Sequence, residues 1–314
     1  MNATSLSRRD ACRMIAAGTV GLTLAPTFSG AAEKSARKKF RFNYILASSL
    51  YGTLPVEVVL EQAPKTGAQW LDIWPKVHGN QREQMEEMGH DKFAELLRKY
   101  KVRLGCISRY DLGPFGLQEE MKVAKKFGAR LLICHSRGPK NLEGEDLKKG
   151  VAEFLENLKP HIAAAEEQGV VIGIANHSAS LIHTPDSIRY FNDGIRSKNI
   201  GLALAPYHLP QDPGLIAQLI DDLGPRLAHF YAWEHGKGSM TKLPKEEEML
   251  QLPGYGSLDF KPILASLKKI NFQGWTSIFM HPVPRGIPIL PTAEECTAAI
   301  NKSRDYLERC LAKA

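Results

Sequence analysis

The sequence predicts a single-domain (β/α)8 barrel, or TIM barrel, over residues 41–314. Two observations carry this prediction. Short apolar runs recur eight times from residue 41 onward, and stretches of helical periodicity lie between them. Eight strands that alternate with helices favour a closed barrel over the alternative, a doubly wound sheet, which needs fewer strands and no closure. No G-x-G-x-x-G motif follows the first expected strand, which counts against a dinucleotide-binding sheet.

The expected strands are short and contain mostly aliphatic or aromatic residues, with polar residues, glycine or proline at their borders. This pattern is typical of strands that are buried on both faces of a parallel sheet. The eight strands are expected at residues 42–47, 70–74, 102–107, 130–134, 170–175, 200–205, 227–232 and 275–280.

The helices between these strands are predicted from apolar spacing and from capping residues. Residues 147–168 carry apolar side chains three and four positions apart, and Gly169 is suited to end that helix. Asp259 is suited to cap a helix over residues 260–269. A further helix is expected at residues 215–223. These helices occupy the intervals that a (β/α)8 barrel requires.

The first 32 residues are expected to be a signal peptide rather than part of the barrel. Arg8 and Arg9 form a charged pair, and residues 14–28 are apolar. The paired arginines resemble a twin-arginine translocation (Tat) signal. Ala11 stands where the common Tat pattern prefers an aromatic residue, so this match is partial. The alternative is a short N-terminal helix packed in the core.

Small residues at positions 29–32 favour cleavage after Ala31 or Ala32. Residues 33–40 are then expected to form a linker to the barrel. The mature protein is expected to be exported to a periplasmic or other extracytoplasmic location. No other apolar stretch is long enough to predict a membrane span in the mature chain.

Charge and composition limit the classes of partner. The chain is 43% hydrophobic and 24% charged, as in ordinary globular proteins, and its net charge is +7. It contains no run of five or six basic residues, so a nucleic-acid partner is not expected. The modest excess of positive charge would favour an anionic ligand such as a sugar phosphate. Alternatively, the charges only form a solvated surface. The sequence leaves the oligomeric state open.

A ligand site is expected at the C-terminal ends of the strands, where barrel enzymes place their active sites. Polar and aromatic side chains gather there, and His177, His208 and Glu234 are the candidates for a general base. Because imidazoles titrate at about pH 6.5, ligand binding is expected to change between about pH 5 and 8. The expected site residues are His135, Asn176, His177, His208, His229, Tyr231, Trp233, Glu234, His281 and Arg285.

Four motifs resemble the xylose-isomerase-like sugar phosphate isomerase/epimerase family. GIANH at residues 173–177 is similar to the family's G-I-E-N-H, and LAPYH at 204–208 to its L-D-x-x-H. AHFYA at 228–232 lies where the epimerases have H-x-H. PGYGSLDF at 253–260 is similar to P-G-x-G-x-x-D-F. The resemblance covers roughly residues 41–310 and implies a TIM barrel that acts on a carbohydrate.

The resemblance also implies one divalent metal. In chain order its ligands would be a glutamate, an aspartate, a histidine and a second glutamate. The glutamates would move a proton beside the sugar carbonyl. This sequence has Ala175, Ala205 and Tyr231 at the first three positions and Phe279 or Met280 at the fourth. No metal is therefore expected at the family positions, and magnesium and manganese are expected to bind poorly. A histidine cluster would suit zinc or another divalent metal instead.

Three functions remain in competition at this stage. The first is a sugar isomerase or epimerase that uses different chemistry, and the second is a carbohydrate-binding barrel without turnover. Aromatic residues such as Trp74 and Tyr207 would stack on sugar faces in either case, or would fill the core. The third is a DNA repair enzyme like endonuclease IV. It is disfavoured because the carboxylates that would bind its zinc ions are absent and because export argues against a DNA substrate. The sequence does not identify the sugar.

Overall fold

The structure, a computed structural model, describes residues 40–314. The expected signal peptide at residues 1–32 lies outside the described residues, and so does the linker except for its last residue, Phe40. In the part of the chain that is described, no helix is both long enough and apolar enough to cross a membrane.

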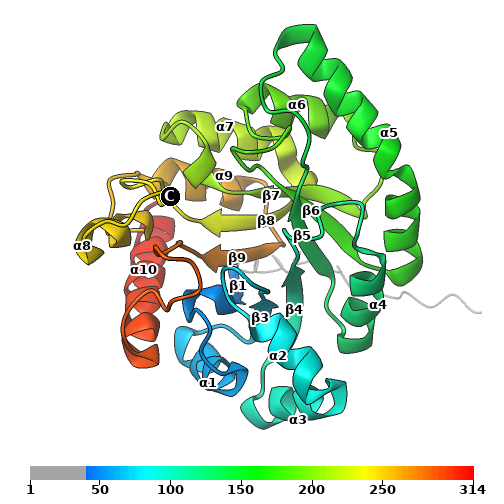
Figure 1. Ribbon diagram of the computed structural model, residues 1–314. Helices are drawn as coiled ribbons and strands as arrows, with labels where there is room; N and C mark the ends of the chain where they lie inside the picture. Colours follow the sequence, from blue (N-terminus) through cyan, green and yellow to red (C-terminus); the bar gives the residue numbers. More distant parts are fainter. Residues whose placement is uncertain (1–39) are drawn as a thin grey trace, which may run out of the picture. The chain divides into compact units, whose positions relative to one another are not determined.

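Nine parallel strands form one sheet that curves into a barrel (Figure 1). Along the sheet the order is β1-β9-β8-β7-β6-β5-β4-β3-β2. The strands are β1 (Asn43–Tyr44), β2 (Leu46–Ala47), β3 (Trp70–Ile73), β4 (Arg103–Ser108), β5 (Leu131–His135), β6 (Val171–Ala175), β7 (Ile200–Leu204), β8 (Leu227–Ala232) and β9 (Trp275–Ile278).

The first expected strand is divided into β1 and β2, which closes the ring. Only Ile45 separates the two halves. β1 pairs with β9 and β2 pairs with β3, each in parallel. The backbone N–H of Ile45 donates to the carbonyl of Thr276 at 3.0 Å, which continues the pairing with the last strand. The predicted TIM barrel is therefore confirmed, and a doubly wound sheet is excluded.

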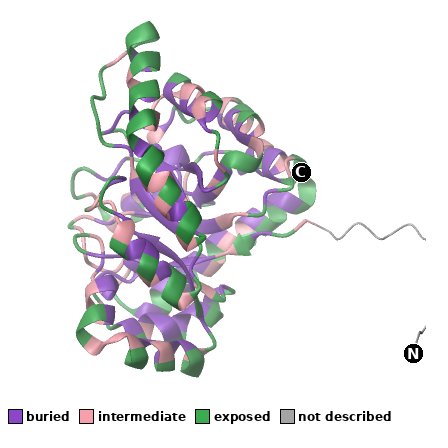
Figure 2. Cartoon of the chain, turned by 90° about the vertical axis from the view of Figure 1, so that its right-hand side faces the viewer, coloured by how far each residue is buried: buried purple, intermediate pink, exposed green. Residues whose placement is uncertain are grey.

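Helices follow the strands and surround the barrel, with their exposed positions turned outward (Figures 1 and 2). Their inward faces bury aliphatic and aromatic side chains against the sheet. The helices are α1 (Val56–Gln62), α2 (Gln81–Met88), α3 (His90–Tyr100), α4 (Gln118–Phe127), α5 (Gly144–Gln168), α6 (Pro185–Gly194), α7 (Pro213–Leu223), α8 (Lys245–Glu248), α9 (Phe260–Lys269) and α10 (Ala293–Lys313).

Capping residues set the ends of the helices as the sequence predicts. Gly169 ends α5 in the left-handed conformation, with φ of 70°, which costs glycine no steric penalty. The Asp259 carboxylate accepts a hydrogen bond from the backbone N–H of Lys261 and so begins α9. Asp212 plays the same part for α7. With these ends fixed, the loops after the strands gather at the C-terminal mouth of the barrel.

Candidate functional site

The C-terminal mouth of the barrel contains a cavity in two connected parts. The outer part has a volume of about 320 Å³ and the inner part about 30 Å³. The two parts share five lining residues, which follow five different strands of the barrel. The shared residues are His78, His177, His208, Trp233 and His281.

The inner cavity brings together the positions at which the resemblance places metal ligands. Ala175, Ala205, Tyr231 and Phe279 all line it, and each is at most 2% exposed. Met280 is buried and does not line this cavity, so Phe279 is the strand-end residue that faces the mouth. No aspartate or glutamate lines either part of the cavity.

These donors do not fit a hard divalent cation. Magnesium and manganese prefer carboxylate and carbonyl oxygens, whereas the inner cavity offers methyl groups, aromatic rings and imidazoles. Within residues 40–314, no three His, Cys, Asp or Glu side chains are arranged so that they could hold a metal ion together. The histidines of the mouth therefore do not converge on a common point as zinc ligands do.

The imidazoles at the mouth lie in pairs. The rings of His78 and His281 are stacked with centroids 4.1 Å apart, and the rings of His177 and His208 are 4.5 Å apart. Burial lowers the pKa of both His78 and His177 to about 4 and that of His208 to about 2, and it lowers the pKa of His281 well below its usual value. All four rings are thus neutral at neutral pH. A neutral ring has one hydrogen-bond donor and one acceptor, and the acceptor Nδ1 atoms of His177 and His208 already receive the backbone N–H groups of Ala179 at 3.2 Å and Ser178 at 3.5 Å.

The outer cavity is shaped by an aromatic stack and a network of polar contacts. Tyr207 lies face to face with Trp233, with ring centroids 3.9 Å apart. The Tyr207 hydroxyl hydrogen-bonds to the Ser239 hydroxyl at 2.8 Å, and Arg285 donates to the Ser239 carbonyl at 2.7 Å. Ser239 and the exposed Met240 bring the long loop after β8 to the cavity wall. Arg285 is the one permanently charged side chain of this lining.

A buried carboxyl group orients the floor of the inner cavity. Asp72, in β3, accepts hydrogen bonds from the Trp74 indole N–H at 2.7 Å and from the Ser108 hydroxyl at 2.9 Å. Burial raises the pKa of Asp72 to about 7. The Trp74 ring that it holds stacks on Tyr110 and Phe279, which both line the inner cavity. Asp72 itself does not reach the cavity.

Four of the expected site residues do not line the cavity, and three of these four make their contacts inside the barrel wall. Glu234 turns toward the loop before α9 and accepts a hydrogen bond from the backbone N–H of Leu258 at 2.8 Å. His229 is fully buried and hydrogen-bonds to the Ser277 hydroxyl at 2.8 Å. Asn176 is fully buried and binds the backbone after β7. All three side chains are held by contacts inside the barrel wall, although Nδ1 of His229 and Oε1 of Glu234 have no hydrogen-bond partner among the described residues.

The remaining expected residues divide between the cavity and its rim. His177, His208, Tyr231, Trp233, His281 and Arg285 line the cavity. His135 lies beside it, with its ring 5.6 Å from the ring of His177, and accepts a hydrogen bond from the backbone N–H of Arg137. The structure thus brings most of the predicted mouth together.

The expected site residues leave out several residues that line the outer cavity, among them His78, His235 and Ser239. His78 lies in the loop after β3, beyond the strand end itself, and Ser239 and His235 lie in the long loop after β8. No strand-end motif contains His78. The length and the glycine content of the loop after β8, over residues 234–258, are the signals that point to the other two.

A family profile described as xylose isomerase-like TIM barrel matches residues 60–309 of the chain. Among curated proteins, D-psicose 3-epimerase of Enterocloster bolteae is 27% identical over 126 residues. That match covers 39% of this chain and 38% of the epimerase, so the chain matches well under half of that relative.

Solved structures share the fold over almost their whole length. D-psicose 3-epimerase of Clostridium cellulolyticum H10, determined with D-tagatose, has a TM-score of 0.65 at 15% identity and covers 86% of this chain and 99% of its own. The IolI protein with a bound zinc atom has a TM-score of 0.63 at 18% identity, with coverage of 85% and 99%. At these identities the likeness establishes the fold alone.

Proposed function

The chain belongs to the xylose isomerase-like TIM barrel family, and from that premise we propose that it binds a neutral carbohydrate at its C-terminal mouth without a divalent metal. One observation carries the proposal: Ala175, Ala205, Tyr231 and Phe279 line one inner cavity that contains no carboxylate. The relatives with related sequence and fold include sugar epimerases.

The chemistry of the mouth suits an uncharged, hydroxylated ligand. Trp233 and Tyr207 provide aromatic surface of the kind on which the apolar face of a sugar ring packs. The Nδ1 atoms of His177 and His208 accept from the backbone N–H groups of Ala179 and Ser178, so each neutral imidazole presents its Nε2–H group as a hydrogen-bond donor to a hydroxyl group. Arg285 adds a donor at the outer edge. The outer cavity, at about 320 Å³, has the size of a small-molecule site.

Binding without turnover agrees best with the acid–base groups present. Epimerisation beside a carbonyl requires a base with a pKa near the working pH. Glu234 has a pKa raised to about 7 by burial, but its carboxylate is directed at Leu258 and not at the cavity. The imidazole of His177, with a pKa of about 4, is a weak base. These properties support a binding protein.

A second candidate is an epimerase that uses histidines in place of the metal site. It is favoured by the separation of 4.5 Å between the rings of His177 and His208, which would let one ring accept a proton while the other donates one. Incubation with D-fructose or D-tagatose in heavy water distinguishes the candidates. A binding protein leaves the C–H groups of the sugar unexchanged, whereas an epimerase introduces deuterium next to the carbonyl.

We further propose that residues 1–32 direct export and are removed after Ala31 or Ala32. The paired arginines at positions 8 and 9, the apolar stretch after them and the small residues at the expected cleavage site support this. Mass spectrometry of the exported protein tests the cleavage site. Replacement of both Arg8 and Arg9 by lysine should abolish export, and undisturbed export would contradict the Tat assignment.

The carbohydrate proposal is tested by following the indole N–H signals of the four tryptophans by NMR. D-psicose, D-tagatose and D-fructose are the probes, each added with manganese or with a chelator. We expect one of them to shift the signals of Trp233 and Trp74, equally in both conditions. Trp233→Phe should weaken this binding, whereas Trp275→Phe, at the opposite end of the barrel, should not. Binding that requires manganese would refute the proposal.

A further inference from the structure

The opposite end of the barrel also holds a cavity, which we call the basal mouth. Its volume is about 580 Å³, within the range of small-molecule sites. The first residue of every strand from β3 to β9 lines it, so it lies on the barrel axis at the N-terminal strand ends. The C-terminal mouth shares no lining residue with it.

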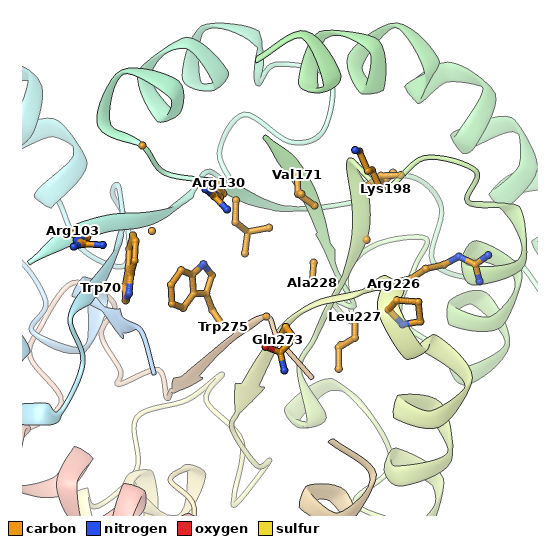
Figure 3. Close-up of a pocket in the computed structure, with 17 residues that line it drawn as sticks. Trp70, Arg103, Arg130, Val171, Lys198, Arg226, Leu227, Ala228, Gln273 and Trp275 are labelled. Carbon is orange, nitrogen blue, oxygen red and sulfur yellow. The ribbon is translucent and has the colours of Figure 1, made fainter. Parts of the chain in front are cut away.

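The floor of the basal mouth is aromatic. The rings of Trp70 and Trp275, the first residues of β3 and β9, have centroids 4.8 Å apart and are inclined at 46° (Figure 3). Gly105, in the adjacent strand β4, leaves room for both rings, because a Cβ atom there would lie 3.2 Å from the Trp70 ring and 3.4 Å from the Trp275 ring. Both indoles remain partly exposed to the cavity.

The rim of the basal mouth is positively charged. Arg103, Arg130 and Lys198 line it, and no aspartate or glutamate does. Across residues 40–314, none of these three side chains forms an ion pair. The Arg103 guanidinium lies 5.4 Å from the centre of the Trp70 ring, and Figure 3 labels both side chains. Arg226 is the fourth basic residue of the lining, and in the same view its side chain extends away from the indoles.

A barrel gains no stability from this arrangement, since uncompensated like charges around one opening repel each other. A ligand with a flat ring would stack on the indoles, and its anionic groups would pair with the guanidinium and ammonium groups of the rim. We propose that the basal mouth is a second binding site, for an aromatic organic anion of about mononucleotide size. It is independent of the carbohydrate site.

Adenosine 5′-monophosphate (AMP) is a suitable probe, with adenosine and inorganic phosphate as its two parts. In the full chain, AMP should shift the indole N–H signals of Trp70 and Trp275 and leave those of Trp74 and Trp233 in place. Each part alone should bind at least about tenfold more weakly, which corresponds to about 1.4 kcal/mol. Binding should also weaken as salt is added.

Charge-removing variants locate the site. Arg130→Gln and Lys198→Gln should each weaken AMP binding by about tenfold. Lys149→Gln, on the exposed surface of α5, removes the same charge and should change it less than about twofold. Because both rim residues are exposed, the variants should fold, which circular dichroism checks. The proposal is overturned if AMP leaves Trp70 and Trp275 unshifted, if phosphate alone binds as well as AMP, or if Lys149→Gln has the larger effect.

Discussion

The side-chain amide of Asn176 forms two hydrogen bonds with the backbone of Ala205, in place of the backbone pairing that ends with β6 and β7. Its Oδ1 atom accepts from the Ala205 N–H at 2.7 Å, and its Nδ2 group donates to the Ala205 carbonyl at 3.0 Å. Asn176 follows the last residue of β6, and Ala205 follows β7. The clamp joins the two strand ends just below the mouth and is fully buried.

Replacing Asn176 by alanine should therefore destabilise the barrel. Both backbone groups of Ala205 would lose their partner in a buried place, at a cost of about 2 kcal/mol in the free energy of unfolding. Urea denaturation measures this change. Asn43→Ala removes one exposed hydrogen bond to Gln273 and should cost less than about 0.5 kcal/mol. Equal losses in both variants would show that the clamp contributes nothing beyond an ordinary surface contact.

The rings of His78 and His177 should stay neutral well below neutral pH. Burial lowers the pKa of His78 and His177 to about 4, against about 6.5 for an unfolded imidazole. Between these values the unfolded chain binds more protons, so the stability that these groups contribute is present above about pH 6.5 and is lost as the pH falls toward 4. Titration of the ring protons of His78 and His177 by NMR should give midpoints of about 4 in the folded protein. In urea the midpoints should be about 6.5.

The contribution of His177 and His208 to carbohydrate binding should accordingly be constant between about pH 6 and 8. This corrects the expectation from sequence, which placed the change between about pH 5 and 8 because it used the pKa of a solvated imidazole. Titration with the sugar probes by isothermal calorimetry measures the dependence. A loss of affinity centred near pH 6.5 would mean that the rings of His177 and His208 are hydrated and that burial does not govern their charge.

The barrel could be predicted from sequence because its signals are local. Buried parallel strands form continuous apolar runs, and residues such as Gly169 and Asp259 mark helix ends within a single turn. The predicted and observed strands differ by at most two residues at either end, and β8 has the predicted bounds. The division of the first strand at Ile45 could not be predicted, because it depends on pairing with β9, more than 200 residues away.

The site was harder to predict because strand position does not fix side-chain direction at a strand end. His177 and His208 lie at the mouth as expected. Glu234 and Asn176 occupy equally suitable places in the sequence, yet the one turns toward the loop before α9 and the other toward a neighbouring strand. His78 enters the cavity from a loop whose course depends on tertiary contacts. Only three-dimensional packing separates these cases.

Glu234→Gln should stabilise the protein at alkaline pH. Burial raises the pKa of Glu234 to about 7 despite hydrogen bonds from the backbone of residues 256–258. The folded state therefore holds a proton that the unfolded state releases, so stability is lost as the pH rises from about 4 through 7. Glutamine keeps the acceptor for Leu258 without the charge. Thermal melts should show its advantage growing from pH 5 to about pH 8, and a constant difference would contradict the raised pKa.

Restoring the donors of the inner cavity should create a manganese site. The variant combines Ala175→Glu, Ala205→Asp, Tyr231→His and Phe279→Glu, and the removal of two large rings makes room for the new side chains. Manganese that binds only the folded state would raise its stability by about 2.7 kcal/mol at a hundredfold excess over Kd. The unsubstituted protein should show no such rise. Without metal the variant should be less stable, because buried carboxylates repel each other.

The matched control places the fourth carboxylate one residue further along, with Met280→Glu in place of Phe279→Glu. Met280 is buried and does not line the inner cavity, so its replacement cannot complete the ligand set. Thermal melts with and without manganese should therefore distinguish the two combinations, provided that circular dichroism shows both folded. If only the combination with Met280→Glu responds to manganese, then Met280 and not Phe279 occupies the fourth ligand position. If the unsubstituted protein responds, the metal is held by groups other than the four positions of the inner cavity.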